Sequence, residues 1–301
     1  MKRKVAKIGP STLMISLPSK WVKIHGIKQG DELEVIENNA ELVVRSDSRA
    51  KIGEKTIDIE EMDNMVYRLV GALYKRGYSN VKLLFHNNKQ LQSIYKVLSD
   101  TCIGLEILDN GKGYVTLKQV AETSQQEFSN IVRRLFIFLT ENVNNSVEAV
   151  KNLNVDELNN LILNDKNINR YSDLARRLIN SRILQNSPEG PLYYIVEQLE
   201  KIGDDYRDLF KHAIEMRIKI DGKLLALYKE VSELLSHFYR LFYTFNFKSL
   251  EEFYIKNSAI KTKIKTMWDE LPKKELRVLF YLENIHKSIF DLNGSVMTNN
   301  L

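Results

Sequence analysis

Long amphipathic helices with few interruptions constrain this chain more than any other sequence feature. From residue 122 to 297, apolar residues recur at helical spacing, and the breaks fall at "NSPEGP", at Asp221-Gly222 and at Pro272. Short connections of this kind place consecutive helices antiparallel. We therefore expect an all-α region with six helices, at residues 124–150, 155–184, 192–218, 223–246, 249–269 and 273–292.

These six helices are predicted to form two copies of a three-helix unit. Glu200 and Glu283 lie 83 positions apart, and Pro188 and Pro272 precede the equivalent helices at nearly the same separation. "YIVEQLEKIGDDYRDL" and "VLFYLENIHKSIFDL" share Leu-Glu-x-Ile followed by an Asp-Leu pair. Internal similarity at a fixed period indicates repeated structural units. The helical domain at 122–297 should then comprise repeats at about 122–220 and 223–292.

The first 48 residues have a different pattern, in which polar and apolar residues alternate. "KVAKIG" and "TLMISLP" predict strands, Pro18 ends the second, and a short helix follows with Ser19 as its N-cap. "DELEVIENNAELVVR" predicts two more strands around a turn at Asn38-Asn39. Fewer than fifty residues bury little apolar surface, so dimerisation is the expected remedy.

Residues 50–120 predict a small α+β connector between these regions. Its expected order is α-β-α-β-β: a helix within 59–78, a strand at "NVKLLFH", a helix at "KQLQSIYKVLSD" and a hairpin turning at Asn110-Gly111. We expect His86 to be a surface residue. The segment contains no glycine-rich phosphate loop and no Ser/His/Asp set in a recognisable context.

Charge and composition limit the compartment and the partners. The net charge is +5, and residues 1–28 hold seven lysines and arginines with no acid, which favours a polyanionic partner. The single cysteine, Cys102, excludes an internal disulfide and indicates a reducing compartment. No apolar run reaches the ~18 residues of a membrane span, so we expect a cytoplasmic protein without membrane insertion.

The N-terminal segment resembles the AbrB/MazE/SpoVT family. The resemblance is carried by "KIGPSTLMISLPSKWVKIHGIKQGDELEV...AELVVR". It implies a swapped-hairpin β-barrel made by two chains, and DNA binding. Ser16 stands where many relatives carry an arginine, so a bidentate base reader is missing. DNA would then be held mainly through its phosphates, by basic side chains at Lys2, Arg3, Lys4 and Lys7.

The helical region resembles the PhoU family of phosphate-homeostasis proteins. "LEKIGD", residues 199–204, matches that family's Glu/Asp-x-x-x-Asp signature, whose carboxylates bind multinuclear metal clusters. The resemblance implies a metal site, for iron, zinc or manganese, at Glu200 and Asp204. Further ligands would come from Glu197 on the same helix and from Asp165 and Asn169 on the preceding one.

An ordinary salt-bridged helix face explains the same carboxylates without metal. Glu197 with Lys201, Asp204 with Arg207 and Asp208 with Lys211 have the spacing of helical ion pairs. The second repeat lacks the signature, because Lys287 follows Glu283 where an acid is needed. His286 makes a Glu-x-x-His there, but no other helix offers a second such motif. Any metal site should therefore be single.

The two resemblances together imply a non-enzymatic regulator of phosphate uptake that binds DNA through a dimeric barrel. The alternative is a dimeric adaptor that does not bind DNA and controls a phosphate transporter or signalling protein by direct contact. A metal-dependent enzyme is disfavoured, since no nucleophile, general base or pocket accompanies the carboxylates.

Overall fold

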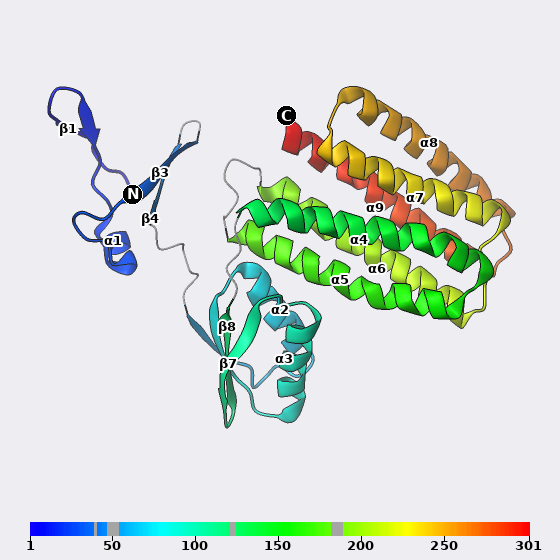
Figure 1. Ribbon diagram of the computed structural model, residues 1–301, viewed down its shortest axis with the longest axis horizontal. Coiled ribbons are helices and arrows are strands. Elements are labelled where there is room, and N and C mark those ends of the chain that lie inside the picture. The colour runs from blue at the N-terminus through cyan, green and yellow to red at the C-terminus, as the bar shows by residue number, and fades with distance from the viewer. Residues whose placement is uncertain (39–40, 47–53, 121–124, 182–188) are drawn as a thin grey trace. The chain divides into compact units, whose positions relative to one another are not determined.

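The computed structural model describes residues 1–38, 41–46, 54–120, 125–181 and 189–301. The chain divides into two compact units, residues 1–53 and residues 54–301, and each is described by itself (Figure 1). A small β region, a mixed sheet and a helical region follow one another along the chain, which confirms the predicted order. In the described residues, no helix combines the length and the apolar character needed to cross a membrane.

The first unit contains two antiparallel hairpins and one short helix. Strand β1 (Ala6–Ile8) pairs with β2 (Thr12–Met14), and β3 (Leu33–Asn38) pairs with β4 (Glu41–Ser46). Helix α1 (Ser19–His25) comes between the two hairpins along the chain. Gly26 is its C-cap and has a left-handed φ of 63°. The expectation that Ser19 caps this helix is wrong. Pro18 is the N-cap and Ser19 is already the first helical residue.

None of the residues whose side chains are described in this first unit is buried. Apolar strand residues that should form a core are open to solvent: Leu13 is 69% exposed and Leu42 is 68% exposed. The second half of the turn predicted at Asn38-Asn39 lies outside the described residues. The two-chain barrel remains a prediction.

The second unit begins with a four-stranded sheet in the order β5-β6-β8-β7. Strand β5 (Lys55–Asp58) is parallel to β6 (Asn80–Leu84), and helix α2 (Val66–Arg76) connects them. Helix α3 (Asn88–Asp100) leads into the antiparallel pair β7 (Leu105–Gly111) and β8 (Tyr114–Gln119). Alternate residues of the strands, such as Val81 and Leu83, are buried in one core with residues of α2 and α3.

Three expectations for this sheet need correction. Strand β5 was not predicted, because four residues are too few to display an alternating pattern. Helix α2 starts only at Val66, so the predicted helical start at 59–65 is wrong. The hairpin turns at Lys112-Gly113 instead of Asn110-Gly111: the register shifts between Ile107 and Asp109, and Gly113 takes the positive φ of 83°.

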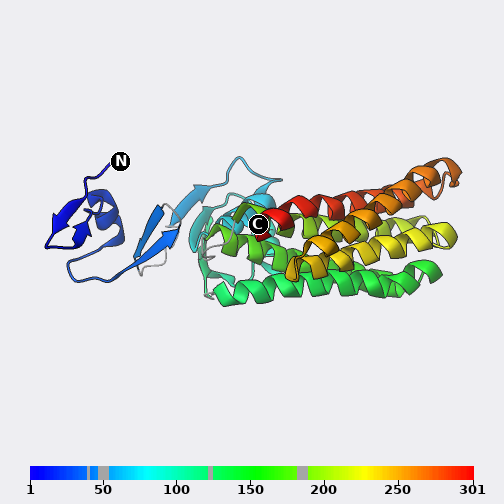
Figure 2. The same cartoon turned by 90° about the horizontal axis from the view of Figure 1, so that it is seen from above.

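Six helices of the described chain lie side by side in the helical region (Figure 2). They are α4 (Gln125–Asn152), α5 (Val155–Asn180), α6 (Glu189–Glu215), α7 (Gly222–Tyr243), α8 (Phe247–Glu270) and α9 (Leu276–Asn300). Helices α4–α6 pack together, as do α7–α9, and the two sets meet through α6 with α9 and α4 with α7. Helix α5 also packs against α2 of the sheet.

Candidate functional site

The predicted metal ligands Glu197, Glu200 and Asp204 lie on α6, on the side of the helix that faces α5, and the predicted helpers Asp165 and Asn169 lie on α5. Leu199, Ile202 and Tyr206 form the buried stripe of α6. The acidic side chains outside this stripe remain partly exposed to solvent: Glu197 is 51%, Glu200 25%, Asp204 34% and Asp208 43% exposed. We call these four residues the carboxylate ridge.

Arg176 of α5 binds the first half of the carboxylate ridge. Its guanidinium, only 1% exposed, forms ion pairs with Glu197 and Glu200. Its Nη2 also donates to Asp173 Oδ1 at 2.6 Å, one helical turn earlier on α5. Asp173 lies in turn 3.5 Å from the ammonium of Lys75 on α2. Arg176 is therefore surrounded by three carboxylates.

Arg207 of α6 binds the second half. It forms an ion pair with Asp204, and its Nη1 donates to Asp165 Oδ2 of α5 at 2.9 Å. Its Nη2 lies 3.0 Å from Asp208, and Lys211 lies 3.8 Å from the same carboxylate. Asn169 donates to Asp165 Oδ2 at 3.2 Å. The predicted ligands Asp204, Asp165 and Asn169 are thus brought together around a guanidinium.

Glu200 and Asp204 consequently belong to two different sets. Within the described residues, neither belongs to a group of three or more His, Cys, Asp or Glu with ligand atoms close enough to hold one ion. The ion pair predicted between Asp204 and Arg207 is confirmed, as is that between Asp208 and Lys211. The ion pair predicted between Glu197 and Lys201 is wrong, because Glu197 pairs with Arg176 of α5 and Lys201 lies 2.5 Å from Asp205.

Burial and neighbouring charges shift the pKa values of these groups. Burial raises the pKa of Glu200 to about 7, and Arg176 opposes the rise. Burial also raises the pKa of Asp165, against the effect of Arg207. Burial alone would lower the pKa of Arg176, but Glu200, Asp173 and Glu197 together raise it. The guanidinium therefore stays charged.

Two oxygens of the predicted ligand set, Asp165 Oδ1 and Asn169 Oδ1, are buried without a hydrogen-bond partner among the described residues. Such atoms are what a metal ion would need. Asp165 Oδ1 lies close to the backbone of α6, because a Cβ placed on Gly203 would be 3.4 Å from it. The other Asp165 oxygen already accepts from Arg207 and Asn169. The α6 carboxylates Glu200 and Asp204 are thus paired with guanidiniums, and the two free oxygens of the donor set both come from α5.

The second repeat carries an ion pair at the equivalent place, as its sequence predicts. Glu283 lies 2.6 Å from Lys287 and accepts from Trp268 Nε1 at 2.9 Å. Burial acts to raise the pKa of Glu283, but Lys287 and Trp268 outweigh it and hold the pKa below its usual value. His286 is buried, with Nε2 3.3 Å from the carbonyl oxygen of Asn257.

Sequence reasoning missed Arg176, the most buried charge of the site. The signal was an arginine pair inside "DLARRLINS", where most neighbours are apolar. A charge in a run destined for burial needs a counter-charge on a neighbouring helix. The acids of α6 provide it.

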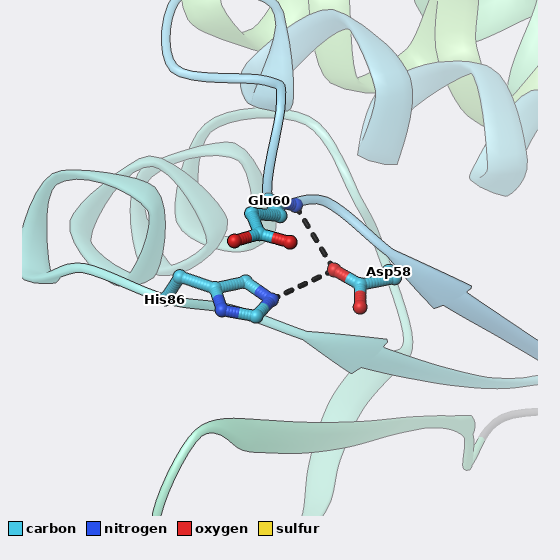
Figure 3. Close-up of side chains that lie close together, drawn as sticks. All are labelled: Asp58, Glu60 and His86. Carbon is cyan, nitrogen blue, oxygen red and sulfur yellow. Dashed lines mark hydrogen bonds and ion pairs between the residues drawn. The ribbon is translucent and has the colours of Figure 1, made fainter.

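A second group of ligand-type side chains lies at the ends of the parallel strands β5 and β6 (Figure 3). Asp58 ends β5 and accepts from the Glu60 backbone at 3.0 Å, and His86 follows β6 with Nε2 2.8 Å from Asp58. The Glu60 hydrogen bond and His86 lower the pKa of Asp58. All three residues are exposed, so the expectation of a surface His86 is confirmed.

The predicted DNA-contacting residues are exposed in the first unit. Lys2, Arg3 and Lys4 precede β1, and Lys7 lies within it. Their side chains are open to solvent.

Comparison with known protein families finds a match for two segments of the chain. Residues 132–213 match the PhoU domain. The PhoU match spans most of α4, all of α5 and most of α6, and so includes Arg176, Glu200 and Asp204. Residues 7–51 match a family described as "Antidote-toxin recognition MazE, bacterial antitoxin". Neither the curated proteins nor the solved structures contain a match to this chain. The chain thus combines a MazE-type segment with a PhoU domain, as the sequence predicted.

Proposed function

We propose that this protein is a cytoplasmic, non-enzymatic regulator of phosphate homeostasis that binds DNA as a dimer. The observation that carries the proposal is the presence of a MazE-type segment and a PhoU domain in one chain. The first supplies contact with DNA, and the second links that contact to phosphate status. A phosphate transporter or a signalling protein is the partner that we propose for the PhoU domain.

The electrostatics of the first unit support DNA as the polyanion. Lys2, Arg3, Lys4 and Lys7 are exposed at one end of a segment with no acid before Asp31. Lysine ammonium groups contact phosphate as point charges and read little sequence. With Ser16 in the place of a base-reading arginine, we expect affinity to exceed sequence specificity.

The exposed apolar residues of the first unit support dimerisation. Ile8, Leu13 and Val35 are all more than half exposed in the single chain. Burying such side chains stabilises a fold by about 25 cal/mol per Å² of apolar surface, and no described side chain of this unit is fully buried in the single chain. A second copy offers the same apolar strands and a matching surface, which is the arrangement of an isologous dimer.

The test is a fluorescence anisotropy titration of the full chain with labelled duplex DNA at about 50 and 200 mM salt, over which several phosphate contacts cost orders of magnitude in affinity. We expect binding that weakens steeply with salt and is reduced in Lys4→Ala/Lys7→Ala. Lys261→Ala/Lys265→Ala is the matched control, since both lysines are exposed on α8. Absence of binding at both salt concentrations would refute the DNA assignment.

The alternative is an adaptor whose first unit dimerises without touching DNA. It predicts that Lys4→Ala/Lys7→Ala leaves the response of cells to phosphate unaltered. A changed response in that variant, with the dimer intact, favours the DNA-binding regulator.

A further inference from the structure

Two arginines pair with the carboxylates of the ridge, at the place where the resemblance to the PhoU family implies a metal ion. We propose that Arg176 and Arg207 are the built-in cations of this PhoU domain. The carboxylates of α6 are neutralised by guanidinium groups of the same chain, and the domain is held together without a metal ion.

The burial of Arg176 is the first argument. A guanidinium that is 1% exposed has lost its hydration and must be compensated by carboxylates at close range. Asp173, Glu197 and Glu200 provide this compensation from two helices. If Glu197 and Glu200 turned to a metal ion, they would leave a buried cation with one partner, at a cost that the new ion would have to exceed.

The geometry of Arg207 is the second argument. Its planar group contacts Asp165 on α5 and both Asp204 and Asp208 on α6, so it joins the same pair of helices one to two turns further along. A metal ion bound between Asp204 Oδ1 and Asp165 Oδ2 would have to occupy the position of the guanidinium. The two cations would also repel each other at contact distance.

The charge balance is the third argument. Each arginine faces three carboxylates, and each set includes a second cation, Lys75 beside Asp173 and Lys211 beside Asp208. Two cations against three acids leave one excess negative charge in each set. A divalent ion added to either set would reverse the sign of that excess, whereas a single proton removes it.

Arg176 does more than neutralise charge, because it connects three helices. It reaches from α5 to α6 directly, and through Asp173 and Lys75 to α2 of the mixed sheet. A metal ion cross-links helices in the same way when carboxylates from several helices bind it. Here the cross-link is encoded in the chain and needs no ion supply.

The first test measures metal on the full chain purified without chelator. We expect iron, zinc and manganese to be substoichiometric, and the melting temperature to be the same with EDTA, Mn²⁺ or Zn²⁺. Stoichiometric metal that disappears in Glu200→Gln/Asp204→Asn would overturn the proposal. DNA binding by the first unit is independent of this result, so failure here leaves the proposed function untouched.

The second test is a double-mutant cycle that isolates the ion pair from general packing. Arg176→Met should lower Tm by roughly 5–10 °C, because it leaves buried carboxylates unpaired. Adding Glu200→Gln to Arg176→Met should cost much less than Glu200→Gln alone, because the partner charge is already gone. Arg170→Met is the matched control, an exposed arginine on the same helix.

Strict additivity of Arg176→Met and Glu200→Gln would contradict a direct charge pairing. So would an Arg176→Met variant as stable as Arg170→Met. If Arg176→Met does not fold, Arg176→Lys replaces it in the cycle. It keeps the charge but loses the bidentate geometry, and we expect a smaller loss of Tm with the same non-additive sign.

Discussion

Arg177 of α5 donates from Nη1 to the carbonyl oxygen of Tyr74 at 2.7 Å. A side chain of the PhoU domain thus hydrogen-bonds to the last turn of α2. The same nitrogen donates to the Tyr78 carbonyl at 3.0 Å, and Asn180 Nδ2 donates to the Lys75 carbonyl at 2.8 Å. The last carbonyl groups of a helix have no partner within the helix. Helix α5 supplies a partner to the Lys75 carbonyl and a second donor to the Tyr74 carbonyl, which also accepts from the Gly77 backbone N–H, and so connects the mixed sheet to the helical region.

Replacement of Arg177 should therefore loosen the sheet from the helices. In Arg177→Met the Tyr74 and Tyr78 carbonyls lose a charged donor, and we expect the free energy of unfolding to fall by about 2–3 kcal/mol. Hydrogen exchange of amides in the last turn of α2 should speed up. Arg170→Met is the control on the exposed face of α5, and equal effects of the two variants in urea unfolding would count against this account.

The close approach of α5 and α6 at Gly203 gives a second prediction. A Cβ at this position would lie 3.2 Å from Ile168 Cγ2, so Gly203→Ala forces the helices apart and should cost about 1–3 kcal/mol. Gly294 lies in α9 with nothing within 4 Å of the same built atom. Gly294→Ala should instead stabilise the helix by about 0.5–1 kcal/mol. Urea unfolding of both variants measures the two signs, and a neutral Gly203→Ala would show that the contact is looser.

The buried His286 predicts how stability depends on pH. Burial lowers its pKa, and Lys287 of α9 and Lys261 of α8 act in the same direction, against the Asn257 carbonyl and Glu283. The unfolded chain then binds more protons than the folded chain below the ordinary histidine pKa of about 6.5. Stability should fall as the pH drops through that value.

His286→Gln should remove this part of the loss when urea unfolding is compared at about pH 8 and pH 5.5. His25→Gln, in the first unit, is the control. An identical pH dependence in wild type and His286→Gln would contradict the assignment to this imidazole.

The exposed strands of the first unit predict the oligomeric state. Leu13 is 69% exposed on β2 and should be buried by the second copy. Leu13→Asp would place a charge in that interface, and light scattering should report a monomer. Thr12→Asp on the same strand is the control. A wild-type chain that is monomeric at micromolar concentration would rule out the dimer.

The sequence predicted the secondary structure well where the elements are long. The helices of residues 125–300 each show several turns of apolar spacing, so their existence was clear and only their ends moved; the last one runs to Asn300 instead of 292. Strand β5 and the hairpin turn depend on a parallel pairing and on a bulge, neither of which leaves a mark in local spacing. Tertiary contacts decide both.

The carboxylates of the candidate site were predicted on two helices, but the arginine that pairs with them on α5 was not. The spacing of Glu197, Glu200, Asp204 and Asp208 predicts a surface ridge opposite the buried stripe of α6. In the structure all four lie outside that stripe, but Glu200 pairs with the buried Arg176 of α5 and is only 25% exposed. Their partner Arg176 lies on α5, and nothing in a single sequence says which face of α5 meets α6. The choice between metal and salt bridge depended on that missing contact.

The central claim, a regulator that binds DNA according to phosphate status, is tested most directly by measuring genome-wide DNA occupancy in the native cells at high and low phosphate. Wild-type protein and Lys4→Ala/Lys7→Ala would be compared at equal abundance. The account predicts sites whose occupancy by the wild type changes with phosphate and is lost in the variant. Wild-type occupancy no higher than that of the variant under both conditions would contradict it.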